Sequence, residues 1–198
     1  MRTAIVCALV AALIGIELLP RAFGWSLNVT PSMPIGYYAA EPDRAPHVGD
    51  IVTVCLTSAG ANYFSEHKLD IPHGSCPGGT STLTKHMAGG EGARFRVDGR
   101  GVWVDERLVP HSAPLAATSE GAMLPRPPAT IVPPGYVVAL SPAERSMDSR
   151  YFGPLPLVTR VRPVPLVATL LAYVLMFVGA GATIGAALSL LHRGPVRA

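Results

Sequence analysis

Residues 94–104, with the sequence RFRVDGRGVWV, indicate the fold class most clearly. Polar and apolar side chains alternate over residues 94–98, a Gly-Arg-Gly turn follows, and an apolar run at residues 102–104 returns as a second strand. Further out, residues 50–55 (DIVTVC) and 136–140 (YVVAL) each follow a turn and predict two more strands. We therefore expect a mainly β domain.

The composition leaves room for one modest domain together with membrane segments. Of the 198 residues, 49% are apolar and 15% are charged, whereas an ordinary soluble domain has about 25% charged residues. The net charge of +3 comes from basic residues scattered along the chain, so we expect no nucleic-acid partner. The apolar excess is concentrated at the two ends of the chain.

The N-terminal end predicts a membrane anchor over residues 1–23. Residues 3–16 are uncharged and rich in Ala, Ile, Leu and Val, and Glu17 interrupts the run. This run is short for a span, which needs about 20 residues, and a signal-peptide core is the alternative. The small residues of a cleavage site are missing around residues 21–25, which favours an uncleaved transmembrane signal anchor.

The C-terminal end predicts a transmembrane helix over residues 163–192. Residues 164–191 contain no charged side chain and are long enough to cross a bilayer; a buried core helix is the alternative. With Arg2 on the cytoplasmic side and two spans, both termini would be cytoplasmic. Residues 24–162 would then form a domain on the outer side of the membrane.

A serine and a lysine are the candidate catalytic residues. Ser32 lies in TPSMPIG (residues 30–36), beyond the apolar N-terminal segment, and Lys68 and Lys85 are the two lysines of the chain. A serine hydroxyl needs a base to remove its proton, and lysine is a base near pH 7 only when burial lowers its pKa. Lys85 lies in TLTKHMAG, which is partly apolar, whereas Lys68 lies in the polar SEHKLD. We predict that Ser32 is the nucleophile, Lys85 the base and Lys68 a solvated charge.

His86 offers an alternative base for a Ser–His–Asp arrangement. It adjoins Lys85, so on a strand its side chain would point to the opposite face. The six histidines are dispersed and no cysteine–histidine spacing resembles a zinc site, so we expect no metal, and no cofactor motif is present. Cys55 and Cys76 predict a disulfide if the domain faces an oxidising compartment; two unrelated thiols are the alternative.

Four short motifs resemble those of the type I signal peptidases (peptidase family S26). The run at residues 30–34 is similar to the nucleophile motif, and residues 49–52 (GDIV) are similar to the second motif. Residues 146–153 (SMDSRYFG) are similar to the last motif. The compact run at residues 32–38, and CPGG at residues 76–79 upstream of the lysine, are most similar to the TraF-type peptidases of conjugative transfer.

The resemblance implies a signal-peptidase-like β catalytic domain and assigns roles within it. Ser32 would be the nucleophile and Lys85 the general base, while the Ser32 N–H and the Thr30 hydroxyl would be oxyanion donors. In the last motif, Ser146 would hydrogen-bond the lysine amine and orient it. Asp148 and Arg150 would form a salt bridge that supports the site. An ion pair with no catalytic part is the alternative for the last two.

The sequence departs from the family pattern just after the lysine. Where the family has Arg, Pro and Asp, this chain has His86, Glu91 and Ala93. The candidate dyad is retained, but the turn after it is expected to differ.

The function implied is that of a membrane-bound serine endopeptidase with a Ser–Lys dyad. It would remove leader or propeptide segments from exported precursors, with a conjugative pilin subunit as the implied substrate. It would lie in a bacterial inner membrane, with the catalytic domain on the periplasmic side, and its partners would be the precursor, the bilayer and type IV secretion components. A general leader peptidase is the first alternative, and a non-catalytic scaffold of a secretion apparatus is the second.

Overall fold

The computed structural model describes residue 20, residues 22–174 and residue 178. The chain divides into a smaller unit (Met1–Leu27, Tyr37–Ala39 and Pro163–Ala198) and a larger unit (Asn28–Gly36 and Ala40–Arg162). Most of the anchor predicted at residues 1–23 and most of the span predicted at residues 163–192 lie outside the described residues. Among those that are described, no helix combines the length and the apolar character needed to cross a membrane.

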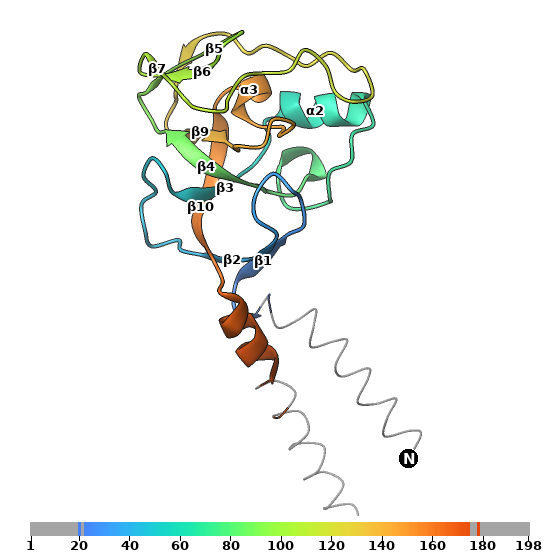
Figure 1. The fold of residues 1–198 in the computed structure, drawn as a ribbon, viewed down its shortest axis with the longest axis vertical. Helices are drawn as coiled ribbons and strands as arrows, with labels where there is room; N and C mark the ends of the chain where they lie inside the picture. The colour runs from blue at the N-terminus through green and yellow to red at the C-terminus, as the bar shows by residue number, and fades with distance from the viewer. Residues whose placement is uncertain (1–19, 21, 175–177, 179–198) are drawn as a thin grey trace, which may run out of the picture. The chain divides into compact units, whose positions relative to one another are not determined.

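The larger unit is built on an antiparallel sheet with the strand order β10-β3-β4-β9 (Figure 1). These strands are β3 (Ile51–Val54), β4 (Leu83–Gly89), β9 (Tyr136–Leu140) and β10 (Leu155–Pro163). The first residues of β10 also pair with β9, so the sheet closes on itself. The strands predicted at residues 50–55 and 136–140 are thereby confirmed.

A second antiparallel sheet has the order β7-β6-β5-β8. Its strands are β5 (Arg94–Asp98), β6 (Gly101–Val104), β7 (Arg107–Leu108) and β8 (Thr130–Ile131). The predicted hairpin is confirmed, with Phe95 opposite Val104 and Val97 opposite Val102. Gly101 is required at the turn because its φ is +149° and a Cβ there would lie 2.6 Å from the Ser112 Oγ.

Strand β9 contributes to two hydrophobic cores. Val137 and Ala139 pack into the core of the closed sheet, whereas Val138 and Leu140 pack against Phe95 of the second sheet and its neighbours. Successive side chains of a strand point to opposite faces, and here both faces are buried. This explains why β9 reads as a continuous apolar run rather than as an alternating one.

Short helices and a disulfide complete the larger unit. They are α2 (Ser58–Glu66), the single turn η1 (Pro77–Gly79) and α3 (Ser149–Phe152). The hydroxyl of Thr57 caps α2 by accepting a hydrogen bond from the Gly60 N–H at 3.2 Å. Cys55 and Cys76 form the predicted disulfide, which links the end of β3 to the start of η1.

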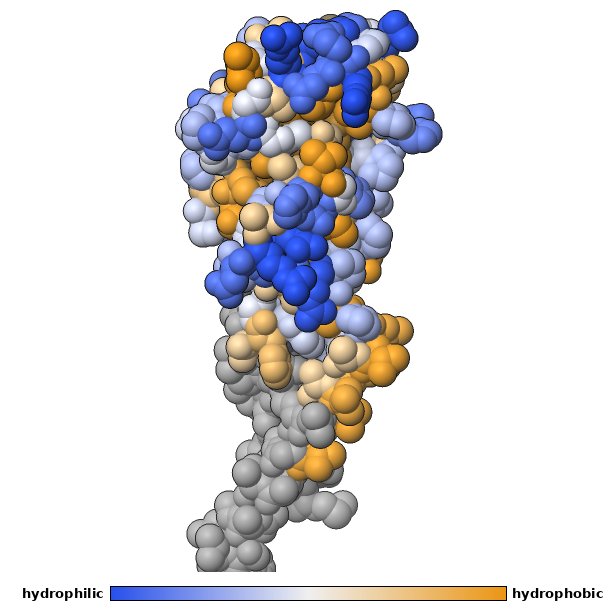
Figure 2. All heavy atoms as spheres, turned by 90° about the vertical axis from the view of Figure 1, so that its left-hand side faces the viewer, coloured by the Kyte–Doolittle hydropathy of each residue, from blue (hydrophilic) through white to orange (hydrophobic). Residues whose placement is uncertain are grey.

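The described part of the smaller unit contains β1 (Trp25–Asn28), most of β2 (Gly36–Ala40) and a helical segment at residues 166–174. The Tyr37 and Tyr173 hydroxyls lie 2.9 Å apart. Several apolar side chains of the helical segment are exposed: Leu166, Val167, Leu170, Leu171 and Val174. Figure 2 shows exposed apolar side chains gathered in one part of the visible surface, and hydrophilic side chains mixed with smaller apolar groups elsewhere on it.

Candidate active site

The two predicted catalytic side chains meet in the larger unit. Ser32 lies on the segment between β1 and β2, and Lys85 lies on β4, which is 53 residues further along the chain. The Lys85 Nζ is 2.9 Å from the Ser32 Oγ. This distance is within hydrogen-bond range, so a proton can pass directly between the two groups.

The alternation of β4 buries Lys85. Lys85, Met87 and Gly89 are buried, whereas the residues between them are half-buried. Lys85 is 3% exposed. Burial lowers its pKa from 10.5 to about 8; Asp148 opposes this decrease and Arg150 adds to it. The lowered pKa increases the fraction of Lys85 side chains that are neutral near pH 7 and able to accept a proton.

The other candidate bases lie elsewhere. His86 follows Lys85 on β4 with the opposite alternation, and its Nδ1 faces the Gly49 carbonyl at 3.5 Å. Within the described residues, the groups bonded to the Ser32 Oγ are Lys85 and Thr30, and His86 is not among them. Lys68 is exposed after α2, as predicted for a solvated charge.

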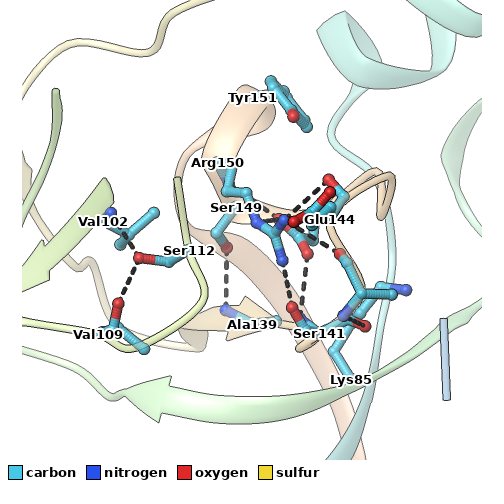
Figure 3. A network of polar contacts seen from close by, with 12 residues as sticks. Lys85, Val102, Val109, Ser112, Ala139, Ser141, Glu144, Ser149, Arg150 and Tyr151 are labelled. Atoms are coloured by element: carbon cyan, nitrogen blue, oxygen red, sulfur yellow. Dashed lines mark hydrogen bonds and ion pairs between the residues drawn. The ribbon is translucent and has the colours of Figure 1, made fainter. Parts of the chain in front are cut away.

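Asp148 and Arg150 form a buried ion pair at the start of α3. Figure 3 shows Arg150 beside Ser141 and Glu144. Both side chains of the ion pair are 0% exposed, and the Arg150 Nε is 3.3 Å from the Asp148 Oδ1. Asp148 also caps α3 by accepting from the Arg150 N–H at 3.1 Å. Burial raises the pKa of Asp148, while Arg150 and Lys85 act in the opposite direction. Arg150 donates to the carbonyls of Ala143 and Glu144 at 3.1 and 3.0 Å.

Ser141 links this ion pair to Ser32 and was not predicted. Its N–H donates to the Asp148 Oδ2 at 3.1 Å, and its hydroxyl donates to the carbonyl oxygen of Ser32. Arg150 in turn donates to the Ser141 carbonyl. The last sequence motif thus connects to Ser32 through Ser141. In the sequence, the only sign of Ser141 is its place directly after the apolar strand at residues 136–140.

Ser146 and Thr30 differ in what they contact. The Ser146 hydroxyl is buried and makes no hydrogen bond to any described residue, so the predicted bond to the lysine amine is not formed in this structure. The Thr30 hydroxyl lies 3.0 Å from the Ser32 Oγ and donates to the Asn28 Oδ1 at 2.9 Å. Thr30 therefore lies beside Ser32, and its role as an oxyanion donor stays a prediction.

The turn after the lysine forms despite its departures from the family pattern. The Ala93 N–H donates to the Gly90 carbonyl at 3.1 Å, and the Gly92 N–H donates to the Val132 carbonyl at 2.9 Å. Gly92 has a φ of +81°, which suits glycine in a tight turn. The substitutions at Glu91 and Ala93 thus leave β4 connected to β5 by an ordered turn.

Comparisons with known proteins identify the family of the chain. The family described as signal peptidase, peptidase S26, matches residues 1–162. A probable conjugal transfer protein TraF from Sinorhizobium fredii is 37% identical over 134 residues, which cover 67% of this chain and 71% of that protein. A conjugal transfer protein TraF from Agrobacterium tumefaciens is 35% identical over 71% of this chain and 82% of its own length. A plasmid transfer protein TraF from Escherichia coli is 31% identical over the same shares.

A solved signal peptidase I from Enterococcus faecalis is 17% identical to this chain. It superposes with a TM-score of 0.31, covering 62% of this chain and 97% of its own. The family match and the sequence relatives are sufficient by themselves to classify the protein. The chain belongs to the signal peptidase family, peptidase S26, and within it to the TraF branch of conjugal transfer proteins.

Proposed function

We propose that the protein is a serine endopeptidase with a Ser32–Lys85 dyad that removes a leader or propeptide from exported precursors. The observation that carries this proposal is the 2.9 Å contact between the Ser32 Oγ and the buried Lys85 Nζ. A lysine whose pKa is lowered to about 8 is a competent base close to neutral pH.

The reaction proceeds through an acyl-enzyme. Neutral Lys85 takes the proton of the Ser32 hydroxyl as the Oγ attacks the scissile carbonyl carbon. The resulting oxyanion accepts from the Ser32 N–H. The Thr30 hydroxyl would become a second donor only by turning its hydrogen away from the Asn28 Oδ1. Protonated Lys85 then gives its proton to the leaving amine, and the C–N bond breaks. Water hydrolyses the ester, or an amine of the substrate attacks it and closes a cyclic peptide.

The buried ion pair supports this chemistry from a distance. Asp148 and Arg150 hold Ser141, and Ser141 holds the carbonyl of Ser32. Through these bonds the last motif fixes the position of the nucleophile rather than taking part in proton transfer.

The relatives and the chain's own features support a proposed substrate and cellular location. Similarity to conjugal transfer proteins favours a pilin precursor delivered at a bacterial inner membrane, with type IV secretion components as neighbours. The disulfide suits an oxidising periplasm, where the catalytic domain would lie. The long apolar run at residues 164–191 supports an association with the bilayer.

Processing in membranes tests the proposal. Membranes carrying the wild type, Ser32→Ala, Lys85→Ala or the control Lys68→Ala are each offered a pilin precursor and a generic secretory preprotein. We expect the wild type and Lys68→Ala to cleave the pilin precursor, and the two dyad variants to cleave it more than about 1,000-fold more slowly. Cleavage by Ser32→Ala at the wild-type rate would exclude the dyad and favour the scaffold. Cleavage of the secretory preprotein alone would favour a general leader peptidase.

A further inference from the structure

Asn28 directs its whole side chain at the segment that carries the nucleophile. Its Nδ2 lies 2.9 Å from the Thr30 carbonyl, 3.0 Å from that of Met33 and 3.2 Å from that of Pro34. Its Oδ1 accepts from the Thr30 hydroxyl at 2.9 Å and from the Thr30 N–H at 3.4 Å. All these partners lie in residues 30–34, which we call the Ser32 loop. An amide has two N–H groups, so three carbonyls share them.

The chemistry of the partners fixes the orientation of the amide. Carbonyl oxygens only accept, so the Asn28 nitrogen must face them and the Asn28 oxygen must face Thr30. The one hydrogen of the Thr30 hydroxyl therefore goes to Asn28. Thr30 consequently presents a lone pair, not a hydrogen, to the Ser32 Oγ at 3.0 Å.

The contacts form a chain that ends at Asn28. It runs from the Lys85 Nζ to the Ser32 Oγ (2.9 Å), to the Thr30 Oγ1 (3.0 Å) and to the Asn28 Oδ1 (2.9 Å). When Lys85 is charged it donates to Ser32, whose hydrogen turns to Thr30. When Lys85 is neutral, its nitrogen accepts the Ser32 hydrogen. Asn28 thus sets the direction in which the Thr30 hydroxyl donates, and thereby which atom the Ser32 hydroxyl can donate to.

The Ser32 loop needs such a partner because of its composition. Pro31 and Pro34 have no N–H to donate, and most of the loop is exposed. The half-buried Asn28 supplies donors to the loop carbonyls from outside the loop. Without them, the Ser32 Oγ would sample positions away from Lys85.

We propose that Asn28 is a positioning residue of the peptidase: it folds the Ser32 loop and orients the Thr30 hydroxyl so that the Ser32 Oγ faces Lys85. This inference rests on the function proposed above. Asn28 acts through Thr30 and Ser32 and does not itself touch the scissile bond. Its amide is engaged within the protein, although Asn28-Val29-Thr30 has the pattern of a glycosylation site.

The chain's other asparagine, Asn62, provides a matched control because it is an exposed residue of α2. The full-length protein in detergent is assayed on the pilin precursor as wild type, Asn28→Ala, Asn28→Asp, Asn62→Ala and Asn62→Asp. We expect Asn28→Ala to lower kcat about 100-fold while KM stays within about threefold, because misplacement of a reacting atom by about 1 Å has an effect of that size. The Asn62 variants should behave like the wild type.

Asn28→Asp separates positioning from folding. It keeps an acceptor for Thr30 but loses the donors to the three carbonyls and adds a negative charge, which favours the charged form of Lys85. We expect the midpoint of its pH–kcat profile to move to higher pH. The two lysines of the chain give two signals in NMR of protein with labelled lysine ε-carbons. The pKa of Lys85 should rise in Asn28→Asp and not in Asn62→Asp, whether or not the substrate is cleaved.

The outcomes distinguish the two proposals. If Ser32→Ala is inactive while both Asn28 variants keep the wild-type kcat and pH profile, the inference about Asn28 is wrong and the peptidase stands. If Ser32→Ala is fully active, the peptidase proposal fails. An unchanged Lys85 pKa in Asn28→Asp would then also show that Asn28 is not coupled to Lys85 through the hydrogen bonds of Thr30 and Ser32. A loss of activity in both Asn28 variants that only follows a lower fraction of folded protein would make Asn28 a purely structural residue.

Discussion

The Ser32 loop and the Asp148–Arg150 pair are held by different means. The Ser32 loop is largely exposed, and neutral hydrogen bonds from Asn28 and Ser141 fix it. Asp148 and Arg150 are 0% exposed, and their charges are compensated by each other and by nearby backbone groups, with a further contribution of Lys85 to Asp148. Damage to the pair should therefore appear first in folding, and damage to the loop contacts should appear first in catalysis.

The largest expected effect comes from breaking the buried pair. Arg150→Met leaves Asp148 buried without its partner, which should lower the free energy of unfolding by about 3–5 kcal/mol. The control is Arg96→Met, which breaks an Arg96–Asp98 pair of 2.8 Å whose side chains are 36% and 38% exposed. An exposed pair contributes about 0–1 kcal/mol. Urea unfolding measures both variants, and equal losses would contradict the contrast between buried and exposed pairs.

The next prediction concerns the pH dependence of activity and stability that Lys85 should produce. In the proposed mechanism neutral Lys85 is the base, and its pKa is about 8, so kcat/KM should rise about tenfold per pH unit below pH 8 and level off above it. The folded pKa lies below the ordinary 10.5, so the unfolded chain binds more protons between pH 8 and 10.5. Stability should therefore rise with pH across that window. Lys85→Met should remove this rise, and an activity midpoint near pH 6 would instead point to a histidine.

The smallest expected effect comes from replacing Ser141, and Ser112, a serine of similar burial, provides the control. Ser141→Ala removes the bond to the Ser32 carbonyl and should lower kcat about tenfold, the equivalent of about one hydrogen bond. Ser112 is also buried, accepts from the Val102 N–H at 2.8 Å and donates to the Val109 carbonyl (Figure 3). Ser112→Ala should lower stability by a similar amount, about 1 kcal/mol, and leave kcat unchanged. Equal kcat values for the two variants would show that Ser141 does not help to position Ser32.

Local patterns in the sequence predicted much of the fold. The hairpin at residues 94–104 and the strands at residues 50–55 and 136–140 follow from turn residues and strand periodicity, which act over a few neighbours. Helix α2 was not predicted. Its sequence, SAGANYFSE, lacks a strong apolar period, and it is stabilised by the packing of Phe64 into the core and by the Thr57 cap.

In the candidate site as well, some residues were predicted from the sequence and others were not. Ser32 and Lys85 were predicted because a nucleophile and its base must be particular residue types in particular surroundings. The sequence offered no comparable sign of Asn28 or Ser141, because a residue that binds backbone carbonyls and N–H groups can come from any element that folding brings close. The membrane segments predicted at the two ends stay predictions.

By itself, the sequence determined the mainly β class and singled out Ser32 and Lys85 as candidates, since these depend on residue type and local spacing, whereas it left the pairing of Cys55 with Cys76 open. Only the tertiary structure decided how the pKa of the candidate base is lowered and how the candidate nucleophile is held. The pKa of Lys85 depends on burial by segments far away in the chain, and the Ser32 loop depends on contacts with Asn28 and Ser141. Desolvation and hydrogen-bond geometry are properties of the folded chain, so no local pattern encodes them.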